Sequence, residues 1–352
     1  MNRATIVGLG NPMLDISAVV DSTFLVKHNL HPNKAKHVEN EELFLEIESG
    51  NLDDKYNAGG SIDNACRVAQ RLLGKKADVG YIGCLGNDKN GQILEDAMES
   101  AGVVTYFQKS TEYPTGRCLV LITKKVNRSL VTYPGAANKF TIDHLSLEKN
   151  WDAIRNAKIV YSGAFFLACS KVSLLKVAQF CSISTNKIFC FNLSATFLCR
   201  PPHVERVKEL IQFADLVVGN AEEAETFAEF GLLMDKKDHK LIAKAISMLP
   251  KIGLHRQNRC VIITRGKDPC IVVNGNNNDE VKEFPSIPIK EAHIVDTNGA
   301  GDAFVGGLLA HMAIEGSDVL KVTDEAIFSG LQASFQILKA SGCNDKLLKN
   351  IP

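Results

Sequence analysis

The residue types best suited to chemistry lie in one glycine-rich segment near the C-terminus, Asp296–Gly307 (DTNGAGDAFVGG), which follows a strand-like His293–Val295. Gly299 and Gly301 allow the backbone to approach a ligand closely and to turn its N–H groups toward it. A helical pattern follows, and the N-terminus of a helix adds a partial positive charge that favours phosphate. The segment therefore predicts a phosphate site.

Asp302 suggests what reaction this phosphate site could support. A carboxylate in the first turn of the helix repels phosphate, so it does not suit a simple phosphate cradle. It becomes useful if it removes a proton from a hydroxyl group that attacks the phosphate. The alternative is an acidic residue that only stabilises the start of a helix, which is common. The two glycines and Asn298 just before Asp302 favour the reaction.

A second glycine-rich segment, Asn57–Asn64 (NAGGSIDN), also opens a helical pattern. Its paired glycines, Gly59 and Gly60, would let a flat ligand contact the backbone. Ser61 and Asn64 offer hydrogen-bond donors and acceptors to the hydroxyl groups of a ribose-like ligand. The alternative is an ordinary helix start with a serine cap.

A third segment, Gly8–Asp15 (GLGNPMLD), follows the first predicted strand and partly matches a dinucleotide-binding fingerprint. Met13 stands where the third glycine should be, and Pro12 interrupts the helix that this fingerprint requires. We therefore interpret Asn11 and Asp15 as polar groups at the carboxyl end of a strand, where open α/β sheets bind their ligands.

Composition and missing motifs exclude several classes of protein. The sequence has no G-x-x-x-x-G-K-[ST] loop, no H-R-D or D-F-G motif, no H-E-x-x-H zinc motif and no G-x-S-x-G elbow. Its 40 basic residues balance 40 acidic ones, which argues against nucleic acid and membrane surfaces as partners. No run of 18 apolar residues could span a bilayer. We expect a small-molecule partner.

The elements that must position these segments follow an alternation of strands and helices along the 352 residues. Small residues at helical spacing in Ala303–Ala310 would let that helix pack closely against a neighbour. Several strands are continuous apolar runs, as burial on both faces requires. We predict an α/β fold, one large domain over residues 1–352 with a mostly parallel sheet covered by helices on both faces. The predicted strands are Thr5–Gly8, Val79–Gly83, Leu119–Thr123, Ile159–Ser162, Ile188–Asn192, Leu216–Gly219, Cys260–Thr264 and Ile271–Asn274.

Two stretches break this alternation. Residues from about 16 to 39 show no clear strand–helix pattern, and residues from about 113 to 134 form a predicted hairpin. Consecutive antiparallel strands do not fit a βαβ crossover. We expect the two stretches to form a small β lid over the end of the main sheet; an ornament at the sheet edge is the alternative.

The ten cysteines are spread along the chain, and no two have C-x-x-C spacing. Most lie in apolar runs, where a free thiol behaves as a small hydrophobic side chain. The apolar stretch at the N-terminus is too short for a signal peptide. We therefore expect reduced cysteines in a cytoplasmic protein, with a nuclear pool left open. The sequence does not determine the oligomeric state, and a monomer is one of the states that fit it.

Six segments carry a resemblance to the ribokinase-like carbohydrate kinase family, and the similarity runs over essentially the whole chain in order. Three are typical of the family as a whole: Gly59–Gly60 with Asn64, Asn220–Glu223 (NAEE) and Asp296–Asp302 (DTNGAGD). Three resemble members that act on adenosine: Gly10–Ser17 (GNPMLDIS), Asn127–Leu130 (NRSL) and Gly163–Leu167 (GAFFL). The resemblance implies a ribokinase-like fold and ATP-dependent phosphorylation of the 5′-hydroxyl of adenosine to AMP, a step of purine salvage.

The resemblance also implies roles for the catalytic positions. Asp302 matches the base that deprotonates the 5′-hydroxyl, and Gly299, Ala300 and Gly301 match an anion hole for the transferred phosphoryl group. Arg128 matches an arginine that closes over the phosphates.

The remaining site residues follow from the same resemblance. Magnesium is the implied cofactor, oriented largely through its waters by Asn220 and Glu223. Positions that match adenosine contacts are Asn11, Asp15 (on two ribose hydroxyls), Gly60, Ser61 and Asn64, with Cys118 and Phe166 as apolar walls around the purine. Positions on the side of ATP, the co-substrate, are Asn192, Thr264, Gly266 and Asn298.

Three alternatives stay open at this point. One is a related kinase that acts on inosine, ribose or another sugar. Another is an NAD-dependent oxidoreductase, which the broken glycine fingerprint disfavours. The third is a nucleoside-binding protein without catalysis, which the presence of Asp302 disfavours.

Overall fold

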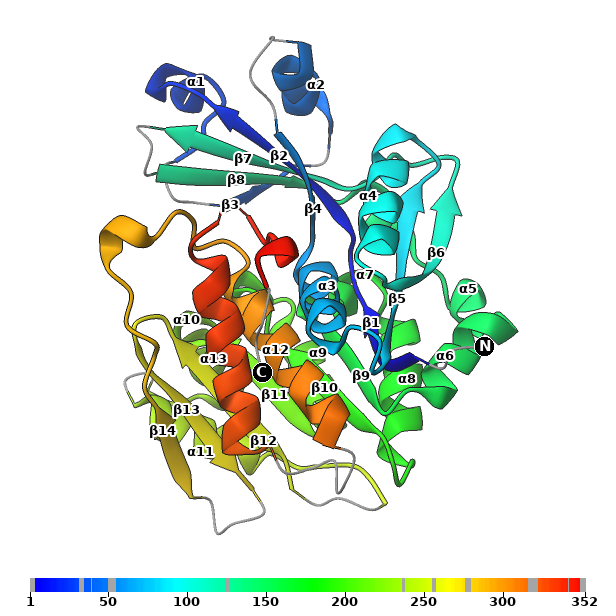
Figure 1. The fold of residues 1–352 in the computed structure, drawn as a ribbon, viewed down its shortest axis with the longest axis vertical. Coiled ribbons are helices and arrows are strands. Elements are labelled where there is room, and N and C mark those ends of the chain that lie inside the picture. Colours follow the sequence, from blue (N-terminus) through cyan, green and yellow to red (C-terminus); the bar gives the residue numbers. More distant parts are fainter. Residues whose placement is uncertain are drawn as a thin grey trace.

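The computed structural model describes residues 4–31, 35–38, 40–49, 55–123, 127–235, 238–254, 258–275, 280–315, 322–340 and 342–348. These residues build two β-sheets, a large one in the body of the molecule and a small one above it (Figure 1). The large sheet has the order β14-β13-β12-β11-β10-β9-β1-β5-β6. Its strands are β1 (Ala4–Leu9), β5 (Asp78–Gly86), β6 (Val104–Ser110), β9 (Ile159–Gly163), β10 (Ile188–Asn192), β11 (Leu216–Asn220), β12 (Cys260–Arg265), β13 (Asp268–Asn274) and β14 (Val281–Phe284).

The large sheet is mostly parallel, as predicted. Every neighbouring pair from β12 across to β6 is parallel, and only the pairs β12–β13 and β13–β14 within the described sheet are antiparallel. The chain runs outward from β1 in both directions, so that β1 and β9 flank the point where the strand order reverses. Such a point leaves a crevice at the carboxyl ends of the strands, where α/β sheets bind ligands.

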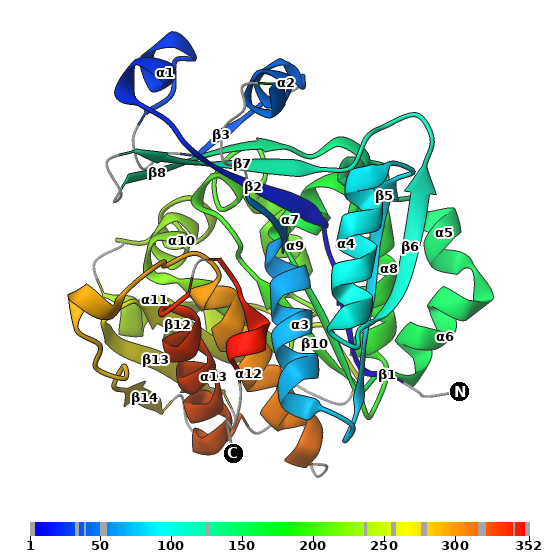
Figure 2. The ribbon, with the colours of Figure 1, turned by 45° about the horizontal axis from the view of Figure 1, so that its top comes forward.

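Helices cover both faces of this sheet, again as predicted (Figure 2). One face carries α3 (Ser61–Leu73), α4 (Lys89–Ser100), α12 (Ala300–Glu315) and α13 (Asp324–Ile337). The other carries α5 (Ile142–Ser146), α6 (Glu148–Asn156), α7 (Ala164–Cys169), α8 (Lys171–Ser182), α9 (Val204–Ile211), α10 (Ala221–Phe227) and α11 (His239–Ser247). Successive residues of an inner strand such as β9 or β10 therefore enter two different cores, and these strands are buried along their whole length.

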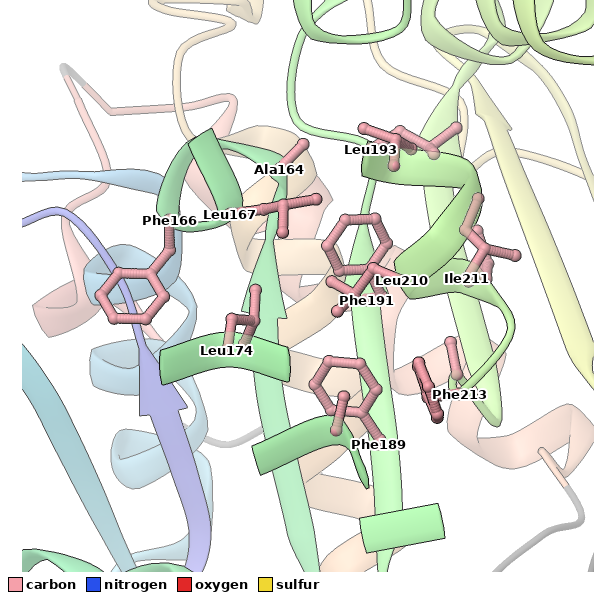
Figure 3. Packing of buried hydrophobic residues seen from close by; sticks show 14 of the residues in the cluster. Ala164, Phe166, Leu167, Leu174, Phe189, Phe191, Leu193, Leu210, Ile211 and Phe213 are labelled. Carbon is pink, nitrogen blue, oxygen red and sulfur yellow. The ribbon is translucent and has the colours of Figure 1, made fainter. Parts of the chain in front are cut away.

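Strand β10 illustrates how the two cores are divided. Ile188 and Cys190 pack toward the face of α3 and α12, while Phe189 and Phe191 pack toward the face of α8 and α9. Figure 3 shows both phenylalanine rings beside Leu174 of α8 and the α9 side chains. Each of these rings is fully buried, which stabilises the fold by about 1.5–3 kcal/mol per side chain.

The small residues of α12 pack closely against its neighbours, as their spacing predicts. A Cβ atom at Gly306 would lie 2.6 Å from the carbonyl oxygen of Ala65 in α3. A Cβ atom at Gly307 would lie 2.6 Å from the carbonyl oxygen of Ser329 in α13. Both glycines therefore set how closely α12 approaches the helices on either side.

The small sheet has the order β3-β8-β7-β2-β4. Its outer face carries Ile16, Leu119 and Leu121, which pack against Leu25 and Phe44 of two short helices. These elements are β2 (Met13–Val19), α1 (Ser22–Lys27), β3 (Ala35–His37), α2 (Glu42–Ser49), β4 (Lys55–Gly59), β7 (Arg117–Thr123) and β8 (Asn127–Tyr133). Alternate residues on the same strands face the body of the molecule.

Two expectations about boundaries were wrong. The first stretch of the small sheet runs from Met13 to Gly59, well beyond the expected 16–39, because β4 pairs antiparallel with β2 and shows no apolar alternation of its own. The segment His293–Val295 is not a strand: a short 3₁₀ turn spans Glu291–His293, and the backbone N–H of Val295 bonds to the carbonyl of Leu338 rather than to a sheet. Across the parts of the chain with assigned positions, no helix is long and apolar enough to cross a membrane.

Candidate active site

A cavity of about 930 Å³ lies between the two sheets. Both contribute to its wall, so residues far apart in the sequence meet there. From the small sheet come Met13, Asp15, Ser17, His37, Asn57, Ala58, Cys118, Val120, Leu130 and Thr132. From the body come Asn11, Gly60, Ser61, Asn64, Phe166, Cys169, Phe197, His203, Asp296, Asn298, Gly299 and Asp302, among others.

The floor of the cavity is formed where α3 and α12 begin. The side-chain amide of Asn64 donates a 2.8 Å hydrogen bond to Oδ2 of Asp302, and Ser61 also hydrogen-bonds to this carboxylate. The cap residue of α3 is Gly60, with φ +102° and no side-chain cap, so Ser61 is not the helix cap. A Cβ atom at Gly60 would lie 2.6 Å from the backbone oxygen of Asn11, so this close approach requires glycine.

Burial makes the carboxylates of this site unusual. Burial raises the pKa of Asp302, and the hydrogen bonds from Asn64 and Ser61 oppose that rise. Burial, with the nearby charges of Asp63 and Asp302, raises the pKa of Asp15 to about 7. Carboxyl groups that bind protons near neutral pH are common at sites that transfer protons.

The segment before α12 folds into a tight loop. Gly299 has φ +77°, and a Cβ atom there would lie 2.7 Å from Cβ of Cys343. Oδ1 of Asp296 accepts a 2.9 Å hydrogen bond from the backbone N–H of Asn298, which holds the loop from within. Asn298, Gly299 and Asp302 line the cavity, whereas Ala300 and Gly301 form the first turn of α12 beside it.

Three other predicted residues lie at or next to the carboxyl ends of adjacent parallel strands. Asn192 ends β10 and Asn220 ends β11, and Thr264 in β12 lies directly opposite Asn220 in the register. Gly266 follows β12 with φ +61° and open space around its Cα. These residues share the sheet edge at which the cavity lies, but they do not line the cavity itself.

Asn220 and Glu223 hold each other at the start of α10. Oδ1 of Asn220 accepts from the backbone N–H of Glu223 at 2.9 Å, and the Glu223 carboxylate accepts from the backbone and side-chain nitrogens of Asn220 at 3.0 and 2.8 Å. This reciprocal cap explains the spacing N-x-x-E. Burial raises the pKa of Glu223 to about 7, and the charge of Asp302 adds to the rise. No cluster of three or more His, Cys, Asp or Glu that could hold a metal occurs in the described ranges.

The other predicted residues are divided between the cavity wall and strand β8 of the small sheet. Cys118 and Phe166 both line the cavity and are almost fully buried. Arg128 belongs to β8, where its backbone lies opposite Ile122, but its side chain lies outside the described part of the structure. The structure thus brings Asn11, Asp15, Gly60, Ser61, Asn64, Cys118, Phe166, Asn298, Gly299 and Asp302 around one cavity.

Sequence reasoning missed Arg67, which lies beneath the cavity floor. Its side chain is 5% exposed and hydrogen-bonds to Asn64, to Asp63 and to Asp345. The pair Asp63 and Arg67 has the i,i+4 spacing of a helical ion pair, so a signal was present. No local sequence pattern pointed to Asp345, because 278 positions separate it from Arg67.

Comparison with known proteins identifies relatives over nearly the full length of the chain. The model of the pfkB family carbohydrate kinases matches residues 38–349. Adenosine kinase 2 of Arabidopsis thaliana is 37% identical over 341 residues, which cover 96% of this chain and 94% of that protein. Adenosine kinase of Dictyostelium discoideum is 35% identical, with 97% of this chain and 96% of that protein covered.

Solved structures show the same similarity. The crystal structure of Anopheles gambiae adenosine kinase in complex with P1,P4-di(adenosine-5) tetraphosphate has a TM-score of 0.86 and 37% identity, with 98% of each chain covered. Adenosine kinase from Schistosoma mansoni in complex with adenosine in an occluded loop conformation has a TM-score of 0.86 and 31% identity, with 98% of this chain and 97% of that chain covered. The chain belongs to the pfkB family of carbohydrate kinases.

Proposed function

We propose that this protein transfers the γ-phosphoryl group of ATP to the 5′-hydroxyl of adenosine, giving AMP and ADP. The observation that carries the proposal is the position of the Asp302 carboxylate, on the cavity floor and directly after the glycine-rich loop at the start of α12. A base and a phosphate-binding helix N-terminus thus lie side by side. Full-length similarity to proteins named adenosine kinase supports adenosine as the acceptor.

Asp302 is the proposed base. It removes the proton from the 5′-hydroxyl as that oxygen attacks the γ-phosphorus, and the bond to the β-phosphate oxygen breaks to release ADP. Because burial raises its pKa, Asp302 is a stronger base than an exposed aspartate, yet the hydrogen bonds from Asn64 and Ser61 favour its ionised form. The backbone N–H groups of Gly299, Ala300 and Gly301 stabilise the charge on the transferred phosphoryl group.

The two substrates occupy different parts of the sheet edge in this proposal. Adenosine lies in the cavity, with Asp15, Asn64 and Asn11 on its ribose and Cys118 and Phe166 beside the purine. ATP lies along the ends of β10, β11 and β12, where Asn192, Thr264 and Gly266 contact it, and it extends to Asn298 in the loop before α12. Positioning of two bound reactants in line supplies a large share of the rate enhancement in phosphoryl transfer.

Asn220 and Glu223 fit a magnesium ion that arrives with ATP. They offer amide and carboxylate oxygens, which magnesium prefers, and magnesium commonly keeps several waters when it binds between carboxylates and phosphates. Glu223 is 7% exposed and its pKa is raised to about 7, so a nearby cation would favour its ionised form. When bound, magnesium neutralises negative charge on the phosphates.

The small sheet is the proposed lid. Its inner face forms one wall of the cavity, and Arg128 of β8 would reach the phosphates when the sheet closes. Closure would exclude water from the γ-phosphate and so limit hydrolysis of ATP. The ten free cysteines, eight of them buried, support a reducing compartment such as the cytoplasm, where the reaction would serve purine salvage.

A coupled assay of ATP consumption with magnesium tests the proposal across adenosine, inosine, guanosine and ribose. We expect adenosine to give the highest kcat/KM and mass spectrometry to identify AMP as the product. Faster phosphorylation of ribose or inosine would assign the site to another acceptor. No ATP consumption with any of the four would contradict the proposal.

A further inference from the structure

Arg67 joins the start of α3 to the C-terminal segment 342–348 beneath the cavity floor. Its Nε donates to Oδ1 of Asp63 at 2.8 Å, and Nη2 donates to Oδ1 of Asn64 at 2.7 Å. Its Nη1 donates to Oδ1 of Asp345 at 2.6 Å and to the carbonyl of Cys343 at 3.3 Å. A charge-assisted network this deeply buried strongly fixes the side chains it joins.

The contact between Arg67 and Asn64 decides which way the Asn64 amide faces. A guanidinium only donates hydrogen bonds, so it binds the oxygen of the amide. The nitrogen of that amide is then left to donate to Oδ2 of Asp302. Without Arg67 the amide would be held only at its nitrogen, and the position of the side chain would be less firmly fixed. Arg67 therefore acts on Asp302 through Asn64.

A second arm of the network reaches the glycine-rich loop. Arg67 anchors the C-terminal segment 342–348 through Cys343 and Asp345. Cys343 leaves no room for a Cβ atom at Gly299, and the backbone N–H of Gly342 donates to Oδ2 of Asp296 at 2.9 Å. The loop that bears the proposed anion hole thus packs on a segment that Arg67 holds in place.

The charge of Arg67 also acts on the carboxylates around it. It lowers the pKa of Asp302 and of Asp15 against the effect of burial. Six ionisable groups, from five parts of the fold, interact with Asp302. They are Asp15 of β2, Asp63 and Arg67 of α3, Tyr161 of β9, Glu223 of α10, and Cys343 near the C-terminus.

We infer that Arg67 is a positioning residue for the proposed phosphoryl transfer: it orients the Asn64 amide toward Asp302 and holds segment 342–348 against the loop before α12. This inference rests on the proposed function and extends it to a residue that touches neither substrate. It predicts that changes at Arg67 act on turnover more than on the binding of adenosine.

Two variants separate the geometry of Arg67 from its charge. Arg67→Gln should lower kcat by about 10–100-fold at pH 7, since small displacements at a reacting centre are costly, and should change the Kd of adenosine by a smaller factor. It should also move the acid limb of the kcat–pH profile to higher pH by about one unit. Arg67→Lys keeps the positive charge but loses the planar, forked set of guanidinium donors. We therefore expect kcat to fall about 10-fold while the acid limb of the kcat–pH profile stays at the same pH.

Arg259→Lys is the matched control. Arg259 is 1% exposed and donates to the carbonyls of Ile211, Ala214 and Ile246 on the other side of the sheet. Both Arg67→Lys and the control should lose thermal stability, but in the control kcat per folded enzyme and the pH profile should stay unchanged. If Arg67→Gln does not fold, Arg67→Lys alone decides the question.

The outcomes separate this inference from the proposed function. A wild-type protein that does not phosphorylate adenosine would remove the proposed function. An active wild type with unchanged kcat in folded Arg67→Lys, or an equal loss in Arg259→Lys, would reduce Arg67 to a structural residue and overturn the inference.

Discussion

The side-chain amide of Asn64 donates a 2.8 Å hydrogen bond to the carboxylate of Asp302, across 238 positions of sequence. Each residue lies in the first turn of its helix, α3 or α12, and the two helices pack closely because Gly306 has no side chain. This contact brings the two glycine-rich segments of the chain to a single carboxylate. The predictions below test what that carboxylate and its surroundings do.

Replacement of Asp302 by asparagine should remove the proposed base and retain the shape of the site. We expect Asp302→Asn to lower kcat by at least about 100-fold, within the usual range for a general base. Binding of adenosine, measured by isothermal titration calorimetry, should change little. Turnover close to that of the wild type would show that Asp302 is not the base.

The rate should fall on the acid side at an unusually high pH. Burial raises the pKa of Asp302, and the base acts only when deprotonated, so kcat is lost as the pH falls through that raised pKa. We expect the midpoint of the acid limb well above 3.8, the ordinary value for aspartate, when kcat is measured at saturating adenosine and ATP. A limb at or below pH 4 would contradict the assignment.

Ionisation of the buried Asp15 carboxyl should destabilise the folded protein at alkaline pH. Its pKa is about 7 in the folded protein against 3.8 for an ordinary aspartate, so the folded state holds an extra proton between these values. The contribution of this group to the free energy of unfolding is therefore greatest below pH 4, and it is lost as the pH rises through 7. Asp15→Asn should therefore raise the free energy of unfolding by about 1–2 kcal/mol at pH 8 and have little effect near pH 4.

Urea unfolding at both pH values measures this effect, with Asp268→Asn, an exposed aspartate, as the control. The same Asp15→Asn variant should bind adenosine more weakly, because the proposed contact with the ribose hydroxyls is lost. Equal free energies of unfolding of Asp15→Asn and the wild type at pH 8 would show that ionisation of Asp15 does not destabilise the fold.

The close packing of α12 predicts opposite effects of the same substitution at two glycines. Gly306→Ala should destabilise the protein by about 1–3 kcal/mol, because the added Cβ would lie 2.6 Å from the backbone oxygen of Ala65. Gly301→Ala meets nothing within 4 Å and should be neutral or slightly stabilising, since alanine favours helix. Urea denaturation of both variants checks this, and equal effects would rule out the packing argument.

Arg128 should matter for turnover more than for nucleoside affinity. If it closes over the phosphates, Arg128→Ala should lower kcat by at least 10-fold, as loss of a positive charge from the transition state does, while the Kd of adenosine changes less. Steady-state kinetics together with calorimetry separate the two quantities. A larger loss of affinity than of kcat would place Arg128 in the adenosine site.

Local patterns revealed much of the fold and part of the site. Each predicted strand, from Thr5–Gly8 to Ile271–Asn274, lies within an observed strand, because runs buried on both faces are apolar throughout. The small residues of Ala303–Ala310 predicted the close packing of α12 against its neighbouring helices. The strand expected at His293–Val295 was wrong, because a 3₁₀ turn binds the backbone N–H of Ile294 to Glu291 and the carbonyl of Leu338 binds that of Val295.

The sequence by itself determined the mostly parallel sheet and the two glycine-rich helix starts, and it singled out Asp302 as the candidate base, since each of these is visible in local sequence patterns. Only the tertiary structure decided that Asp15 binds its proton near neutral pH and that Arg67 and Asp345 meet under the cavity floor. Burial and long-range charge depend on which distant segments pack together, and no local pattern records that choice.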